Sequence, residues 1–136
     1  MAEITSQNSI RIGTAGWSIP LYLKENFDVT GTHLERYAKV FNCVEINSSF
    51  YREHKSETYA KWYLSTPKVF RFSVKLSRYF TQEKRLEEAG VRLQQTLERI
   101  SYLKEKWGVL LVQLPPSLSF KYTITGAAIL ADRILT

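Results

Sequence analysis

Four strand-like segments alternate with helix-like segments along this chain, and this order limits the fold more than any other feature. The strand-like segments begin near residues 10, 43, 70 and 109, so one strand-plus-helix unit takes 27 to 39 residues. Strands separated by helices of this length run parallel and are joined by crossover helices. The sequence therefore predicts an α/β fold of four βα units, built as an open sheet or as part of a closed barrel.

The bounds of the expected elements follow from apolar spacing and from residues that start a helix. Thr32 and Glu35 form a capping box, which predicts a helix over the residues that follow. Ser56 is expected to cap a second helix, and an apolar stripe from Leu93 to Trp107 predicts a long third helix. The expected strands are 10–13, 43–49, 70–76 and 109–114, and a last short helix is expected over 127–135.

Each expected strand has one apolar face and one more polar face. In VEINSSFYR (44–52), Val44 and Ile46 alternate with Glu45 and Asn47. An open sheet with helices on both sides requires two apolar faces, whereas a barrel carries helices only on the outside and turns its other face toward the lumen. The bias favours a TIM-barrel type fold. A whole barrel takes about 250 residues, so residues 1–136 are expected to form a single partial domain, about the N-terminal half of a (β/α)8 barrel.

The net charge of +6 is concentrated in one segment. Residues 68–85 contain six lysines and arginines against one glutamate, a local surplus of five. Such a surplus points to an anionic partner, either a nucleic acid or a phosphorylated small molecule, or else to a solvated surface without a partner. The one cysteine, Cys43, excludes an internal disulfide and is expected to be a small buried residue in a reducing cytoplasm. No apolar run is long enough to span a membrane.

Three polar residues are expected to share the barrel lumen near the carboxyl ends of their strands. Glu45 is suited to general acid–base chemistry, Lys75 to binding an anion or developing negative charge, and Gln113 to orienting either one. The alternative is an ion pair of Glu45 with Lys75 or Arg11 that only satisfies a polar lumen.

Aromatic and basic residues are expected around this site, in the loops after the strands. Trp17, Phe50, Tyr51 and Tyr79 are placed to stack on a base or sugar ring, and Arg52, His54 and Lys55 to contact phosphate. The turn Gly13–Gly16 is expected to bring backbone close to a ligand. The few histidines and aspartates have no metal-site spacing, so no metal site is expected, and the sequence does not identify a cofactor.

Four segments together resemble the YecE-like family, domain of unknown function 72. They are IRIGTAGWS (10–18), VEINSSFYR (44–52), FRFSVKLSRYFTQEKRL (70–86) and VLLVQLPPS (109–117). The resemblance implies a TIM barrel but no established reaction. The positions that match the family's pattern are Thr14, Trp17, Glu45, Asn47, Phe50, Tyr51, Lys75, Gln113, Pro115 and Pro116. The chain has Thr81-Gln82 where members often place a histidine after the threonine, and the family continues past the last residue of this chain.

Three functions remain open from the sequence. The first is an enzyme or enzyme remnant that acts on a phosphorylated or nucleic-acid-like substrate, with Glu45 and Lys75 catalytic. The second is a non-catalytic nucleic-acid-binding protein that uses residues 68–85, and the third is an inactive truncated product. Open strand edges also predict a homodimer. The expected substrate-binding residues are Thr14, Trp17, Asn47, Phe50, Tyr51, Arg78 and Gln113.

Overall fold

A parallel sheet forms the centre of the computed structural model, which describes residues 10–87 and 90–118. Its strands are β1 (Cys43–Ile46), β2 (Arg71–Lys75) and β3 (Trp107–Leu111), in the order β1-β2-β3. Both pairs of neighbouring strands run parallel, as expected from the alternation of strands and helices.

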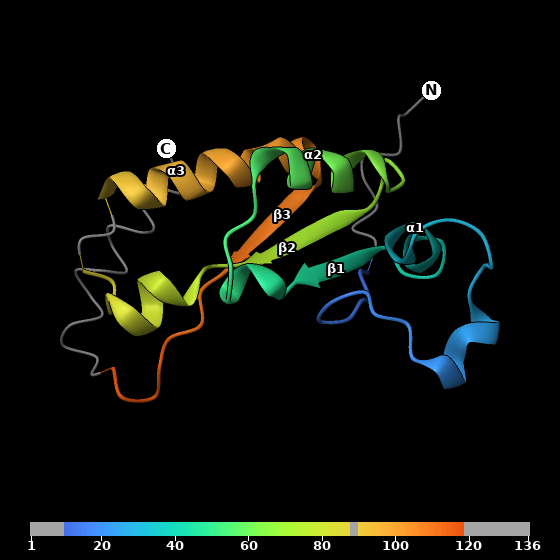
Figure 1. Cartoon of the computed structure of the whole chain (residues 1–136), viewed down its shortest axis with the longest axis horizontal. Helices are drawn as coiled ribbons and strands as arrows, with labels where there is room; N and C mark the ends of the chain where they lie inside the picture. The colour runs from blue at the N-terminus through green and yellow to red at the C-terminus, as the bar shows by residue number, and fades with distance from the viewer. Residues whose placement is uncertain (1–9, 88–89, 119–136) are drawn as a thin grey trace, which may run out of the picture.

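Helices pack on one face of this sheet. The α-helices are α1 (His33–Ala38), α2 (Ser56–Leu64) and α3 (Gly90–Ile100), and Figure 1 shows α2 and α3 along the same side of the strands. Shorter helical turns are η1 (Leu21–Asn26), η2 (Ser48–Phe50), η3 (Tyr79–Glu83) and η4 (Ser101–Lys106). No helix in the described part of the chain has the length and apolar character needed to cross a membrane.

The main core lies between the strands and the helices that cover them. Val44, Ile46, Phe72 and Val74 are almost fully buried there, together with Tyr59 of α2. The alternating residues Glu45, Ser73 and Lys75 are only half-buried. The expected phase of β1 and β2 is therefore confirmed: the apolar face meets the helices and the polar face does not.

The expected first strand, 10–13, is wrong. The side chain of Asn42 takes up the backbone groups of this segment, because it accepts from the Ile12 N–H at 2.9 Å and donates to the Ile10 carbonyl at 3.0 Å. Ile10 and Ile12 are consequently exposed instead of facing the core. This N-terminal segment joins the sheet farther along, through a parallel bridge between Ala15 and Glu45.

Gly13 explains how closely this segment approaches β1. A Cβ at Gly13 would lie 2.0 Å from the carbonyl oxygen of Cys43, so only glycine fits there. The expected role of the Gly13–Gly16 turn was to bring backbone close to a ligand, whereas Gly13 brings it close to β1. Cys43 itself is half-buried, and burial raises the pKa of its thiol.

Other boundaries also differ from the expectation. The expected strand 43–49 ends at Ile46, and the expected strand 109–114 is observed as Trp107–Leu111. The residue that caps α2 is Lys55, and Ser56 is the first residue of the helix. The expected long helix ends early, because Lys104 adopts φ 50° and ψ −132° inside η4, and Trp107 begins β3 instead. The capping box of α1 is confirmed, with Thr32 and Glu35 bonded reciprocally. The expected helix 127–135 lies outside the described residues.

Candidate functional site

Lys75 is the centre of the candidate site. It is the last residue of β2, and its half-buried side chain lies on the face that α2 and α3 leave uncovered. The ammonium Nζ donates to Oδ1 of Asn47 at 3.2 Å and lies 4.4 Å from the centroid of the Phe50 ring. Asn47 follows β1 directly, so the site spans the carboxyl ends of two neighbouring strands.

The turn η2 positions these residues. Its residue Ser49 is buried, and the Ser49 hydroxyl lies 2.5 Å from the carbonyl oxygen of Lys75 and 2.9 Å from that of Ile46. This hydroxyl therefore joins the ends of β1 and β2. Phe50 is also buried, which fixes its ring beneath the ammonium.

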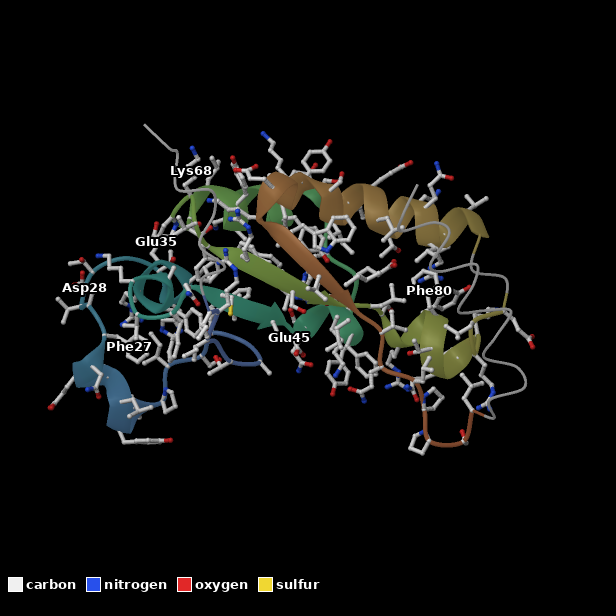
Figure 2. The ribbon with its side chains drawn as sticks, turned by 180° about the vertical axis from the view of Figure 1, so that it is seen from behind. Phe27, Asp28, Glu35, Glu45, Lys68 and Phe80 are labelled. Atoms are coloured by element: carbon white, nitrogen blue, oxygen red, sulfur yellow. The ribbon has the colours of Figure 1, made fainter. Side chains whose placement is uncertain are left out.

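Lys75 and Glu45 form no ion pair with each other or with any other residue in 10–87 and 90–118. Glu45 lies opposite Ser73, which is two residues before Lys75 in β2. Figure 2 shows the Glu45 side chain on the side of the sheet away from α2 and α3. Arg11, the other expected partner of Glu45, donates instead to the Val69 carbonyl at 2.8 Å. The carboxylate and the ammonium thus share a face without neutralising each other.

Thr14 and Trp17 lie in packing contacts and not beside Lys75. The backbone N–H of Thr14 donates to the Tyr37 hydroxyl at 2.8 Å, and that hydroxyl donates to the Cys43 carbonyl at 3.0 Å. The Trp17 ring packs edge-on against Trp62 of α2 at 4.9 Å, on the covered side of the sheet. Both side chains hold the 14–17 segment in place.

The remaining predicted site residues lie farther out at the same edge. Tyr51 is 67% exposed and contacts the Phe50 ring edge-on at 5.1 Å. Arg78 is exposed and forms a long ion pair with Glu83, at 3.8 Å. Gln113 is exposed after the end of β3. The structure therefore brings Asn47, Phe50 and Lys75 into contact, with Tyr51 on the Phe50 ring.

Sequence reasoning missed an ion-pair cluster around Glu53. The half-buried Glu53 carboxylate accepts from the Thr96 hydroxyl and pairs with Arg99 at 3.4 Å and Arg92 at 3.7 Å. Arg92 also lies 3.6 Å from the Tyr79 ring centroid, so α3 holds the loops after β1 and β2 together. Polar residues at 92, 96 and 99 recur at helical spacing, and this sequence pattern could have indicated a polar cluster on one face of the helix.

His54 is a packing residue in the same loop. Its Nε2 lies 2.8 Å from the Ser48 hydroxyl, and its ring packs edge-on against Trp62 at 5.0 Å. Burial lowers the pKa of His54, and the positive charge of Arg52 lowers it further. The described residues contain no group of three or more histidine, cysteine, aspartate or glutamate side chains arranged to hold a metal.

The basic segment 68–85 is divided between the two ends of β2. Lys68 lies before the strand, whereas Arg78, Lys84 and Arg85 follow it. Phe80 belongs to the turn between Arg78 and Lys84, and Figure 2 shows that it is well separated from Lys68. Arg71 turns back, because it donates to the carbonyls of residues 68 and 70 at 3.0 Å. The segment does not present one continuous basic face.

Comparison with known proteins places the chain in a family. Residues 11–131 match the family described as "Protein of unknown function DUF72". The chain belongs to the DUF72 family. The UPF0759 protein YecE of Escherichia coli K12 is 33% identical over 106 residues, which cover 78% of this chain and 38% of YecE. YecE of Escherichia coli O157:H7 matches with the same identity and coverage.

Solved DUF72 structures share the fold. A crystal structure of a DUF72 family protein from Enterococcus faecalis V583 matches with a TM-score of 0.74 and 22% identity, over 92% of this chain and 47% of that chain. A second crystal structure of that family from the same organism gives a TM-score of 0.69 and 20% identity, over 90% of this chain and 47% of that chain. This DUF72 chain thus spans less than half the length of these relatives.

Proposed function

We propose that this DUF72 chain binds an anionic group at Lys75 and belongs to an enzyme that acts on a phosphorylated or nucleic-acid-like substrate. The observation that carries the proposal is the ammonium held between the Asn47 amide and the Phe50 ring, with no carboxylate paired to it in the described residues. A half-buried charge without a counter-ion is costly, and an anionic ligand removes that cost.

Asn47 supplies a second donor for such a ligand. Its Oδ1 accepts from Lys75, so its NH2 group is directed away from the ammonium and remains available. A phosphate oxygen that bridges the Lys75 ammonium and the Asn47 amide would receive two hydrogen bonds, one of them charge-assisted. The proposal assigns the outer positions of the substrate to Tyr51, Arg78 and Gln113, and gives Thr14 and Trp17 a supporting role.

Glu45 is the proposed general acid or base. It lies on the same face as Lys75. Glu45 pairs with Ser73 of the neighbouring strand, two residues before Lys75, so the Cα atoms of Glu45 and Lys75 are roughly 8 Å apart. A group bound at Lys75 is therefore within reach of a carboxylate that no described residue neutralises through an ion pair.

We also infer that the sheet is half of a (β/α)8 barrel. The parallel order, the single helix-covered face and the shared phase of β1 and β2 support this architecture, in which the carboxyl ends of the strands carry the site. The free Cys43 supports a cytoplasmic location.

Calorimetric titration with pyrophosphate at low salt tests the anion site. Lys75→Met keeps the apolar stem and removes the charge, so we expect the affinity to fall at least about tenfold, the effect of roughly 1.4 kcal/mol. Lys68→Met is the matched control, because Lys68 is an exposed lysine before the same strand. Equal affinity of the two variants would reject the proposal.

One observation supports the alternative function, nucleic-acid binding. Cations gather around the Tyr79 ring, with Arg92 at 3.6 Å and the Lys84 ammonium at 5.9 Å from its centroid. Arg78 precedes this turn directly. These cations and the Tyr79 ring are suited to contact a phosphate and a stacked base. The surface they form is smaller than the whole segment 68–85.

A further inference from the structure

The face of the sheet that carries Lys75 also exposes apolar side chains. Val109 of β3 is 59% exposed and Leu111 is 36% exposed, and they pair with Ser73 and Lys75. These residues continue the uncovered face from the candidate site to the outer strand of the sheet. Exposed apolar side chains that adjoin polar ones in this way are typical of a surface that binds another protein.

Both edges of the sheet are also unpaired in the part of the chain that the structure describes. On one side, Gly16 and Thr14 bond to Glu45, so the N–H and C=O of Ala15 point away from the sheet and have no partner among the described residues. On the other side, β3 is the last strand of the sheet that residues 10–87 and 90–118 form. A mainly apolar pocket of about 400 Å³, lined in part by Leu23, Phe27 and Phe41, adjoins the Ala15 edge.

We propose that a second copy of this chain covers the face and pairs with both edges. All strands run in the same direction, so a half-turn about an axis along the strands places β3 of one copy beside the 14–16 segment of the other. The same operation creates this pairing twice, which closes the assembly at two copies and leaves no edge open.

The second copy would complete the candidate site as well as the sheet. Lys75 and Glu45 both lie on the uncovered face, which in one copy is open to water. In the closed pair this face becomes a shared interior with equal numbers of these ammonium and carboxylate groups. Removing water strengthens the electrostatic effect of each charge on a bound anion.

Light scattering coupled to size-exclusion chromatography tests the proposal on the full chain. We expect twice the chain mass for the wild type, and one chain mass for Val109→Asp, because that change places a charge in the interface. Val91→Asp is the matched control, since Val91 is an equally apolar and 73% exposed residue on α3. A wild-type monomer, an open-ended series of larger masses, or a dimeric Val109→Asp variant would overturn the proposal.

Hydrogen exchange on the wild type gives a test that needs no folded variant. The amide of Ala15 exchanges slowly if the edge is paired, and rapidly if it is open, which would contradict the pairing. The result is independent of the proposed function, because a monomer that still binds pyrophosphate through Lys75 rejects only the second copy. Loss of pyrophosphate binding in an intact dimer rejects only the anion site.

Discussion

Lys106 offers the sharpest test of how this fold is held together. Its side chain is only 4% exposed, and burial lowers the pKa of its ammonium. The ammonium donates to the carbonyls of Tyr63 and Thr66 at 2.6 Å, and to the Thr66 hydroxyl at 3.2 Å. Tyr63 lies in the last turn of α2 and Thr66 just after it, so this lysine is the donor to the Thr66 carbonyl at the helix end. It also supplements the 3.2 Å bond that the Thr66 hydroxyl donates to the Tyr63 carbonyl.

Lys106→Met keeps the length and the apolar stem but removes the donor to the Thr66 carbonyl, and it leaves the Tyr63 carbonyl bonded to the Thr66 hydroxyl. A buried polar group without a partner costs about 1–3 kcal/mol, and the weaker bonding of the Tyr63 carbonyl adds to this cost. The methionine side chain carries no charge that must be desolvated, which offsets part of the loss. We therefore expect the free energy of unfolding to fall by about 1–3 kcal/mol.

Urea denaturation followed by circular dichroism measures this change. The control is Lys104→Met, because Lys104 is exposed and its ammonium contacts only the Tyr63 ring, at 5.2 Å from the centroid. We expect the control to lose less than about 1 kcal/mol. If Lys106→Met loses no more stability than Lys104→Met, the reasoning about the helix end is wrong.

Three further changes test separate parts of the structure. Gly13→Ala should lower stability by about 1–3 kcal/mol in urea denaturation, because its Cβ would overlap the Cys43 carbonyl, whereas Gly90→Ala should not lower it, since its Cβ meets nothing within 4 Å. The lowered pKa of His54 predicts that stability falls as pH drops below about 6.5, the ordinary histidine value. His54→Asn should flatten that dependence, and an equal fall in the variant would refute the assignment. Changing Arg78, Lys84 and Arg85 to glutamine should flatten the salt dependence of oligonucleotide binding measured by fluorescence anisotropy, and an unchanged slope would exclude this surface.

The sequence predicted the sheet and its phase because these depend on local patterns. Strict alternation around Val44 and Val74 determines which side of β1 and β2 meets the helices. The same pattern placed Glu45 and Lys75 on the opposite face, and the capping box of α1 needs only residues three apart. Local chemistry was sufficient for these features.

Other features depend on side chains that act at a distance. The pattern of residues 10–13 is strand-like, but Asn42 takes up the backbone groups that a strand would use. The left-handed backbone at Lys104 ends a helical stripe that continues in the sequence. Contact between Glu53 and α3 joins residues 43 and 46 positions apart, so no local pattern reveals which cation meets the carboxylate.

The position of a bound anion tests the central claim most directly. Titration of pyrophosphate into the ¹⁵N-labelled chain, followed by nuclear magnetic resonance, reports on the side-chain amide of Asn47, which the Lys75 ammonium contacts at 3.2 Å. The account predicts that this NH2 signal shifts in a saturable way and that the shift is lost in Lys75→Met but kept in Lys68→Met. A saturable shift confined to the Tyr79 turn, or no shift at Asn47, would contradict an anion site at Lys75.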